Sequence, residues 1–328
     1  MKKTVNWALV GTGGIAKHFL AGLQATKGRA AAVVSRELSR AQSFAKRTGI
    51  AKAFGDFDQM LEDPEIDVVY IGTPHTTHKD LTVRALNAKK AVLCEKPFAV
   101  NAMEAQEMIR TARENNVFLM EAMWTRFRPA MNKVREWLAH GLIGEVKTVQ
   151  ANFGFRAPVE RQHRLFNPEL GGGALLDVGV YPLSFASMVF GAAKPRDIKS
   201  QLVLGETGVD EEAAIILSYG SSRLASVSAA TRTTMINDAW IYGEAGRIHV
   251  PEFVRALGAE LMRDGKKKTV FQHEALSNGF NYEAVEVMNC IGKGQIESPI
   301  MPLDESLVIM ETIDVIRAQW GFRYPFER

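Results

Sequence analysis

The feature that most constrains this chain is a glycine-rich segment, Gly11–Ala16, between an apolar strand and an amphipathic helix. VNWALVG before it is typical of a buried strand, and GIAKHFLAGLQA after it has helical apolar spacing. In this G-x-G-x-x-A pattern, the first glycine permits a tight turn, the second admits a pyrophosphate, and alanine permits close helix packing. A plain tight turn is the alternative. The context favours a dinucleotide site formed by Gly11, Thr12, Gly13, Gly14, Ile15 and Ala16.

The segments that follow continue the alternation of strand and helix. Apolar runs near residues 30–36, 51–55, 67–74, 91–97 and 118–124 are separated by amphipathic stretches. Short, continuously apolar strands between helices predict a parallel sheet covered on both faces. We therefore predict a doubly wound dinucleotide-binding (Rossmann) domain over residues 1–123.

The pattern changes in the remaining chain. Longer strand-like runs lie next to each other there, and AAIILSYG and LASVSAATR are joined by only a short Gly-Ser-Ser-Arg link. Such spacing is typical of hairpins. Residues 124–328 are therefore predicted to form an α+β domain with a large open, mainly antiparallel sheet, serving substrate binding and oligomerisation. The final apolar helix, near 305–321, is expected to pack back on the first domain.

Composition excludes several classes of partner. The net charge of +3 is small for 328 residues, and no basic block suggests nucleic acid. No apolar run approaches the roughly 20 residues of a membrane helix, so no membrane is expected. The opening MKK and its short apolar run do not fit a signal peptide. Cys94 and Cys290 fit neither a disulfide framework nor a zinc site, and a cytoplasmic setting is expected.

The end of the second predicted strand bears on the choice of cofactor. An acidic residue about 20 residues after the glycine pattern is typical of NAD sites. Here the strand ends in Ser35 and Arg36, and Arg40 follows one turn later. Arginines suit a 2′-phosphate and an adenine face, which favours NADP. The alternative is that both arginines are solvated and Glu37 reaches the ribose of NAD.

Polar residues also follow the fourth and fifth predicted strands. Thr73 and Pro74 end IGTP, and His75 and His78 come next. Ligands of doubly wound sheets bind at this carboxyl edge. We predict a cofactor contact and a helix start for these residues and no metal, because no acidic partner is close in sequence. The fifth strand ends in Glu95-Lys96, where a lysine without further context would be a snorkelling surface residue.

Several motifs occur in an order that resembles a known family. The glycine pattern, TPHTTH, CEKPFA, EAMWTRFRP and ELGGGALLDVGVYPL resemble the Gfo/Idh/MocA oxidoreductases over essentially the whole chain. The last two motifs look most like the branch of dimeric dihydrodiol dehydrogenase, also described as NADP-dependent D-xylose dehydrogenase. The resemblance implies that Lys96 lies beside the nicotinamide and assists proton transfer. It also implies that Asp177 and Tyr181 form the second catalytic motif, with tyrosine where many members have histidine.

A tyrosine base needs help from a cation. A free tyrosine with a pKa of about 10 is mostly protonated near neutral pH, and lowering the pKa by two units requires about 2.7 kcal/mol. An ammonium group at about 4 Å supplies roughly 4 kcal/mol at an effective dielectric constant of about 20. Lys96 therefore suffices to activate Tyr181. Asp177 is expected to bind a substrate hydroxyl or to steer Lys96, and Glu95 to orient Lys96 or to bind nearby backbone groups.

Further residues are expected around the pocket. We predict that Trp124 walls the nicotinamide site and that Arg126 reaches a phosphate or the substrate. Phe153, Phe155 and Arg156 are predicted to line the substrate site. The alternative for all of them is packing, between domains or on a sheet face.

Together these features predict an NADP-dependent oxidoreductase acting on a sugar, polyol or cyclic diol, with NAD as the other possible cofactor. The protein is expected to form a homodimer or homotetramer through the second sheet. The alternative function is a non-catalytic cofactor or sugar sensor on the same fold. The presence of both Lys96 and Tyr181 argues against it.

Overall fold

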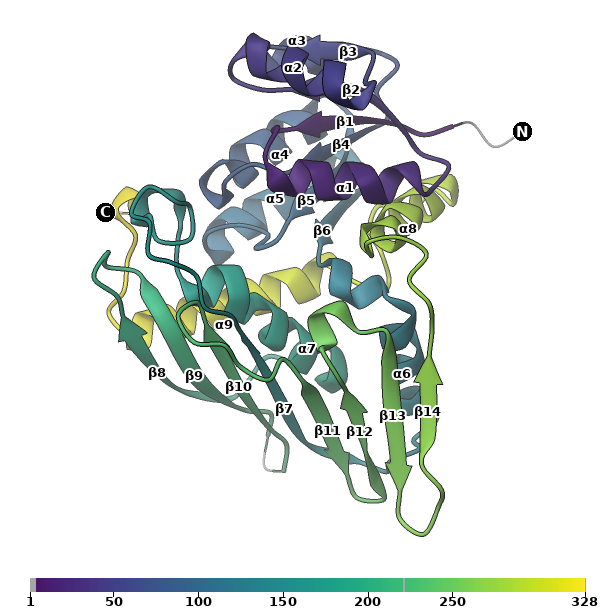
Figure 1. Ribbon diagram of the computed structural model, residues 1–328, viewed down its shortest axis with the longest axis vertical. Helices are drawn as coiled ribbons and strands as arrows, with labels where there is room; N and C mark the ends of the chain where they lie inside the picture. The colour runs from purple at the N-terminus through teal and green to yellow at the C-terminus, as the bar shows by residue number, and fades with distance from the viewer. Residues whose placement is uncertain (1–3, 221, 328) are drawn as a thin grey trace. The chain divides into compact units, whose positions relative to one another are not determined.

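Six strands near the amino terminus form a parallel sheet in the order β3-β2-β1-β4-β5-β6. The computed structural model, which describes residues 4–220 and 222–327, is drawn in Figure 1. The strands are β1 Asn6–Val10, β2 Arg29–Val34, β3 Lys52–Phe54, β4 Val68–Ile71, β5 Ala91–Glu95 and β6 Leu119–Ala122. All residues of β4, β5 and β6 are buried, as expected for strands covered on both faces. The predicted Rossmann sheet is confirmed.

Helices lie between these strands. They are α1 Gly14–Gln24, α2 Leu38–Thr48, α3 Phe57–Leu61, α4 His78–Asn87 and α5 Ala102–Asn115. The Asp56 side chain accepts a hydrogen bond from the Gln59 N–H at 2.9 Å and caps α3. Gly49 ends α2 in the left-handed conformation.

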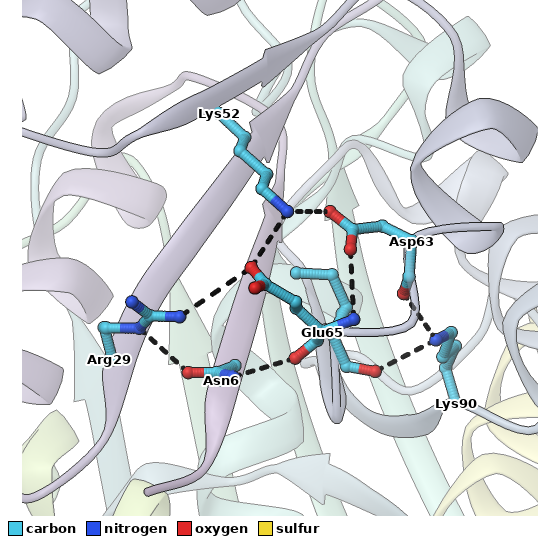
Figure 2. Close-up of polar contacts among 7 residues, drawn as sticks. Asn6, Arg29, Lys52, Asp63, Glu65 and Lys90 are labelled. Atoms are coloured by element: carbon cyan, nitrogen blue, oxygen red, sulfur yellow. Dashed lines mark hydrogen bonds and ion pairs between the residues drawn. The ribbon is translucent and has the colours of Figure 1, made fainter.

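A polar network joins the amino ends of the strands (Figure 2). The Lys52 ammonium lies 2.7 Å from Asp63 Oδ2 and 2.9 Å from Glu65 Oε2. Arg29 Nε donates to Asn6 Oδ1 at 2.9 Å, and Lys90 Nζ donates to the Asp63 carbonyl at 2.8 Å. The network stabilises this edge of the sheet, and the predicted cofactor residues all follow the carboxyl ends.

The chain divides into two compact units that are not two uninterrupted segments. The first unit runs to Ala99 and also contains Met103–Trp124 and Ala275–Ser306; the second contains Val100–Ala102, Thr125–Glu274 and the chain from Leu307 onward. A single boundary after residue 123 therefore differs from this division. The reason is that α8 (Phe280–Gly292), which comes late in the chain, packs on α1. Figure 1 shows the two helices side by side.

The second unit is built on an eight-stranded sheet in the order β14-β13-β12-β11-β7-β10-β9-β8. Neighbouring strands are antiparallel except β7 and β10, which are parallel. The strands are β7 Val146–Gly154, β8 Asp197–Leu204, β9 Asp210–Ser218, β10 Leu224–Ala230, β11 Ala239–Gly243, β12 Gly246–Val250, β13 Gly258–Arg263 and β14 Thr269–Gln272. The predicted mainly antiparallel sheet is confirmed, including the β9–β10 pair, although Ser221 in its link lies outside the described residues.

Helices α6 (Pro129–Ala139), α7 (Val180–Phe190) and α9 (Leu303–Gln319) complete this part of the chain. From Leu307 onward α9 belongs to the second unit. The Ser306 hydroxyl donates to Glu121 at 2.7 Å, and Arg317 Nη1 donates to the Val100 carbonyl at 3.0 Å, so the final helix contacts residues of the predicted first domain, as expected. The segment Pro168–Phe190 is apolar and long enough to span a membrane by composition, contrary to our expectation from sequence. Since 89% of its apolar window is buried within the protein, it is typical of a core helix.

Candidate active site

The turn between β1 and α1 has the geometry that a dinucleotide phosphate requires. Gly11 has a φ of +100°, and a Cβ atom there would lie 2.9 Å from the Gly72 carbonyl oxygen, so only glycine fits. The space around Gly13 and Gly14 is open, and both are exposed. Among the described residues, no side chain caps α1 and no acid lies in its first turn. The first N–H groups of this helix therefore suit a pyrophosphate.

The end of β2 carries the residues predicted to select the cofactor. The Ser35 N–H donates to the Phe54 carbonyl at 3.2 Å, and Arg36 is exposed. Arg40 Nε lies 2.9 Å from Glu37 Oε2 in an exposed ion pair. Because exposed pairs contribute little stability, a phosphate group can compete with Glu37 for Arg40. Arg40 and Glu37 are thus paired with each other, whereas the two alternatives from sequence assigned Arg40 to NADP binding and Glu37 to NAD binding.

The segment after β4 is connected to the segment after β5 by His78. Its Nε2 lies 3.0 Å from the Thr73 carbonyl and its Nδ1 lies 3.0 Å from the Pro97 carbonyl. Burial lowers the pKa of His78, so the ring is neutral at pH 7 and donates to one of the two oxygens. His78 begins α4, as predicted, and is fully buried. It therefore braces two loops of the predicted cofactor site.

The neighbouring residues complete this edge. Pro74 precedes a short helical turn, His75–Thr77, and the Thr77 hydroxyl donates to the Thr73 hydroxyl at 2.7 Å. His75 is buried with its ring edge-on to His78. Within the described residues no group of three or more His, Cys, Asp or Glu side chains is arranged to hold a metal ion.

Glu95 and Lys96 follow at the carboxyl end of β5. Tyr70, on β4, donates its hydroxyl to Glu95 Oε1 at 2.6 Å, and the Lys96 N–H donates to Glu95 Oε2 at 3.2 Å. Glu95 is buried and Lys96 is half-buried; the Lys96–Pro97 peptide bond is cis. Glu95 therefore binds a local backbone group, one of its two predicted roles. Sequence analysis missed Tyr70 because it reads as one apolar residue in a strand.

Trp124 was predicted to wall the nicotinamide site and Arg126 to reach a phosphate or the substrate, and the two residues have different surroundings. The Trp124 ring, in the first unit, stacks on Phe280 with centroids 4.9 Å apart. Arg126, in the second unit, is buried, and its guanidinium donates to the Ser184 hydroxyl at 2.9 Å and the Ser184 carbonyl at 2.7 Å. These contacts agree with packing, which was the alternative role predicted for Arg126.

Asp177 and Tyr181 lie on one face of a continuous helical segment in the second unit. Asp177 is in a π-helical turn, Leu175–Gly179, and Tyr181 follows at the start of α7. Residues four apart in a helix are neighbours, and π-helical turns are frequent at functional sites. Arg164 Nη1 lies 2.7 Å from Asp177 Oδ1. Sequence analysis missed Arg164 because its segment shows no periodic pattern.

The aromatic residues at the end of β7 lie near this helix. The Phe153 ring is edge-on to Tyr181 at 5.3 Å between centroids. Phe153 and Phe155 both pack against a small buried cluster, Ala174, Val178 and Ala229. Arg156 is exposed. The structure thus brings Phe153 and Tyr181 together, and contact of these residues with a substrate stays a prediction.

The Gly171–Gly173 loop before Asp177 is held in place by buried residues. Tyr324 donates its hydroxyl to the Gly172 carbonyl at 2.8 Å. Asp210 Oδ2 accepts the Leu175 N–H at 2.6 Å, and a side chain at Gly173, which has a φ of +125°, would collide with Asp210. These contacts fix the loop in position, and the loop in turn supports the helical turn that contains Asp177.

Asp210 predicts a pH dependence of stability. Burial raises the pKa of Asp210 from 3.8 to about 6, and each pKa unit corresponds to about 1.4 kcal/mol. Because the folded-state pKa is the higher one, this stabilisation is complete below pH 4 and is lost as pH rises through 6. We expect the unfolding free energy of the wild type, relative to Asp210→Asn, to fall by about 2 kcal/mol between pH 4 and pH 7. Parallel urea unfolding of both proteins measures this difference; a constant difference would contradict the assignment.

Comparison with protein families and curated proteins agrees with this architecture. Residues 5–123 match the oxidoreductase family with an NAD-binding Rossmann fold, and residues 131–249 match the GFO/IDH/MocA C-terminal domain. A trans-1,2-dihydrobenzene-1,2-diol dehydrogenase of Xenopus tropicalis is 38% identical, covering 97% of this chain and 99% of the relative. The Mus musculus protein of the same name is 37% identical, covering 99% of both chains.

Solved structures share the whole fold. A 3-ketoreductase from Actinomadura kijaniata, in complex with NADP and TDP-benzene, has a TM-score of 0.84 and 25% identity, covering 96% of this chain and 98% of the other. An aldose-aldose oxidoreductase from Caulobacter crescentus, complexed with glycerol, has a TM-score of 0.87 and 23% identity over 98% of this chain and 99% of the other. With both domain matches and full-length relatives, the chain belongs to the Gfo/Idh/MocA family of NAD(P)-dependent oxidoreductases.

Proposed function

We propose that this protein transfers a hydride between NADP(H) and a hydroxyl-bearing carbon of a cyclic diol, sugar or polyol. The observation that carries the proposal is the position of Lys96, which follows β5 on the same sheet edge as the Gly11–Ala16 turn. Ligands of doubly wound sheets bind at this edge. The relatives named as dihydrodiol dehydrogenases, at 37–38% identity over nearly the full chain, support a diol among the substrates.

The residues divide the chemistry as follows. The bound nicotinamide supplies a hydride acceptor. Tyr181 takes the proton from the substrate hydroxyl as its C–H bond gives up the hydride, and Lys96 stabilises the phenolate during this step. Asp177, held by Arg164, accepts a hydrogen bond from a second substrate hydroxyl. In the reduction direction Tyr181 returns its proton to the carbonyl oxygen.

NADP is the cofactor that we favour. Arg36 is exposed at the end of β2, and Arg40 is held one turn into α2 by an exposed ion pair with Glu37. A 2′-phosphate carries more charge than the Glu37 carboxylate and competes well for a guanidinium.

We place the protein in the cytoplasm. We also propose self-association through the second sheet, whose strands carry exposed Val203, Leu204, Ile216, Leu224 and Val270.

The test is a spectrophotometric screen with NADP(H) and NAD(H) in parallel, over cyclic diols, aldoses, cyclitols and dicarbonyls. We expect turnover of at least one class and a kcat/KM at least tenfold higher with NADP(H). A strong preference for NAD(H) would contradict the role of Arg36 and Arg40. Quenching of cofactor fluorescence without turnover of any compound would favour a sensor instead.

A further inference from the structure

Glu283 is a buried acid that the proposed mechanism leaves unused. It lies on the buried face of α8 with no exposed surface. Among the described residues, neither of its carboxyl oxygens has a hydrogen-bond partner. An ionised carboxylate in such a place is strongly disfavoured, so the neutral acid is the stable form.

The position of Glu283 is imposed by the packing of α8 on α1. A Cβ atom added at Gly22 of α1 would lie only 2.7 Å from Phe280 Cβ, so the two helices are in close contact there. Asn278 Nδ2 also donates to the His18 carbonyl at 2.7 Å. These contacts hold the helix, and with it Glu283, without any bond from the carboxyl group itself.

Glu95 is the neighbouring acid, and its surroundings are the opposite of those of Glu283. Its two oxygens accept hydrogen bonds from the Tyr70 hydroxyl at 2.6 Å and the Lys96 N–H at 3.2 Å. The charge of Glu95 acts on Glu283, and the charges of both act on Tyr70. Burial and the Glu95 charge raise the pKa of Glu283 well above its usual range. Donors stabilise the charged form of a carboxyl group, and only Glu95 has them.

We infer that Glu95 and Glu283 form a buried acid pair in which Glu283 carries the proton and Glu95 carries the charge. Glu283 is then a positioning residue that keeps a single negative charge beside Lys96. Two neighbouring carboxyl groups in different surroundings commonly divide into an acid and a base in this way. The link to catalysis rests on the proposed function of Lys96, whereas the location of the proton does not.

The other titratable groups around the pair do not replace Glu283 as the proton carrier. Burial raises the pKa of Tyr70 on β4 and of Cys94 on β5 well above their usual ranges, so both stay protonated through neutral pH. From α1, His18 is exposed and its ring stacks on Phe280 with centroids 6.4 Å apart. Lys96 follows Glu95 directly. At alkaline pH, ionisation of Glu283 adds a second negative charge near Lys96, which offsets the positive charge of the ammonium group and weakens its stabilisation of the Tyr181 phenolate.

Infrared difference spectroscopy of the free protein tests the protonation of Glu283. We expect the spectrum of the wild type minus that of Glu283→Gln, at pH 7, to show the C=O band of a protonated carboxylic acid. Glu286→Gln is the matched control, because Glu286 lies on the same helix, is partly exposed and accepts the Ser298 hydroxyl at 2.6 Å. Its subtraction should leave no such band. The absence of the band from the first difference spectrum would overturn the inference.

Two further measurements complete the test. If Glu283→Gln does not fold, Glu95→Gln replaces it: removing the like charge should make the band titrate at a lower pH than in the wild type, and an unchanged titration would overturn the pairing. With active enzyme, the alkaline loss of kcat should shift to higher pH in Glu283→Gln and stay in place in Glu286→Gln. An unshifted profile would overturn the positioning role. A band without turnover of any substrate would refute the proposed function and leave the acid pair standing.

Discussion

Replacing Lys96 with alanine should lower kcat by about 10³-fold while cofactor affinity changes only a few-fold. Assistance to proton transfer by a positioned group typically contributes 10²–10⁴-fold. Lys96 is the one charged side chain that the E-K-P segment offers at the sheet edge for this role, since Glu95 is held by Tyr70 and by the backbone. Rapid-mixing measurement of hydride transfer, together with fluorescence titration of NADPH, separates the chemical step from binding.

The matched control is Lys90, at the other end of the same strand. Its ammonium donates to the carbonyls of Asp63 and Ile66 at 2.8 and 3.0 Å, so Lys90→Ala should cost stability and leave kcat of the folded enzyme unchanged. Full turnover by Lys96→Ala would remove Lys96 from the mechanism. A loss of NADPH affinity with unchanged kcat would reassign it to cofactor binding.

The second large effect is expected from Tyr181→Phe, which keeps the ring and removes only the hydroxyl. The substitution keeps the ring that lies edge-on to Phe153 with centroids 5.3 Å apart, so this packing contact should be preserved. We expect kcat to fall by 10²–10⁴-fold and the pH-dependent limb of the rate profile to disappear. Tyr242→Phe is the control, because the Tyr242 hydroxyl donates to Gln150 Oε1 at 3.3 Å in an exposed contact; this substitution should leave kcat unchanged.

A double variant then tests whether the two residues act together. Lys96 belongs to the first unit and Tyr181 to the second. If Lys96 acts through Tyr181, the Lys96→Ala/Tyr181→Phe protein should be no slower than the slower single variant. Multiplicative losses would show that the two side chains contribute independently, and a Tyr181→Phe enzyme with wild-type kcat would require another base.

The cofactor-binding turn was the easier part of the site to predict, because the residues that form it are close together in sequence. The left-handed Gly11, the open Gly13 and the start of α1 all lie within six residues, and one pattern describes them. The residues that support the site were harder. Tyr70 and Glu283 resemble ordinary members of a strand and a helix. The hydrogen bond to Glu95 distinguishes Tyr70, and complete burial of a carboxyl group distinguishes Glu283.

The role predicted for Arg126 shows a related difficulty. Its place after β6 suggested a contact with a ligand, which stays a prediction. In the structure its guanidinium donates to Ser184, 58 residues later. A sequence shows that a charged side chain is present near a site. The orientation of that side chain depends on which partner the folded chain brings within hydrogen-bond distance.

The sequence by itself determined the parallel sheet, its glycine turn and the antiparallel second sheet, because hydrophobic period and glycine conformation act over a few residues. Only the tertiary structure decided which charges meet. Arg164 pairs with Asp177, Asp210 holds the Leu175 N–H, and Glu283 returns on α8 to the surroundings of Glu95. The physical reason is that burial and distance set the energy of a charge, and both exist only in the folded chain.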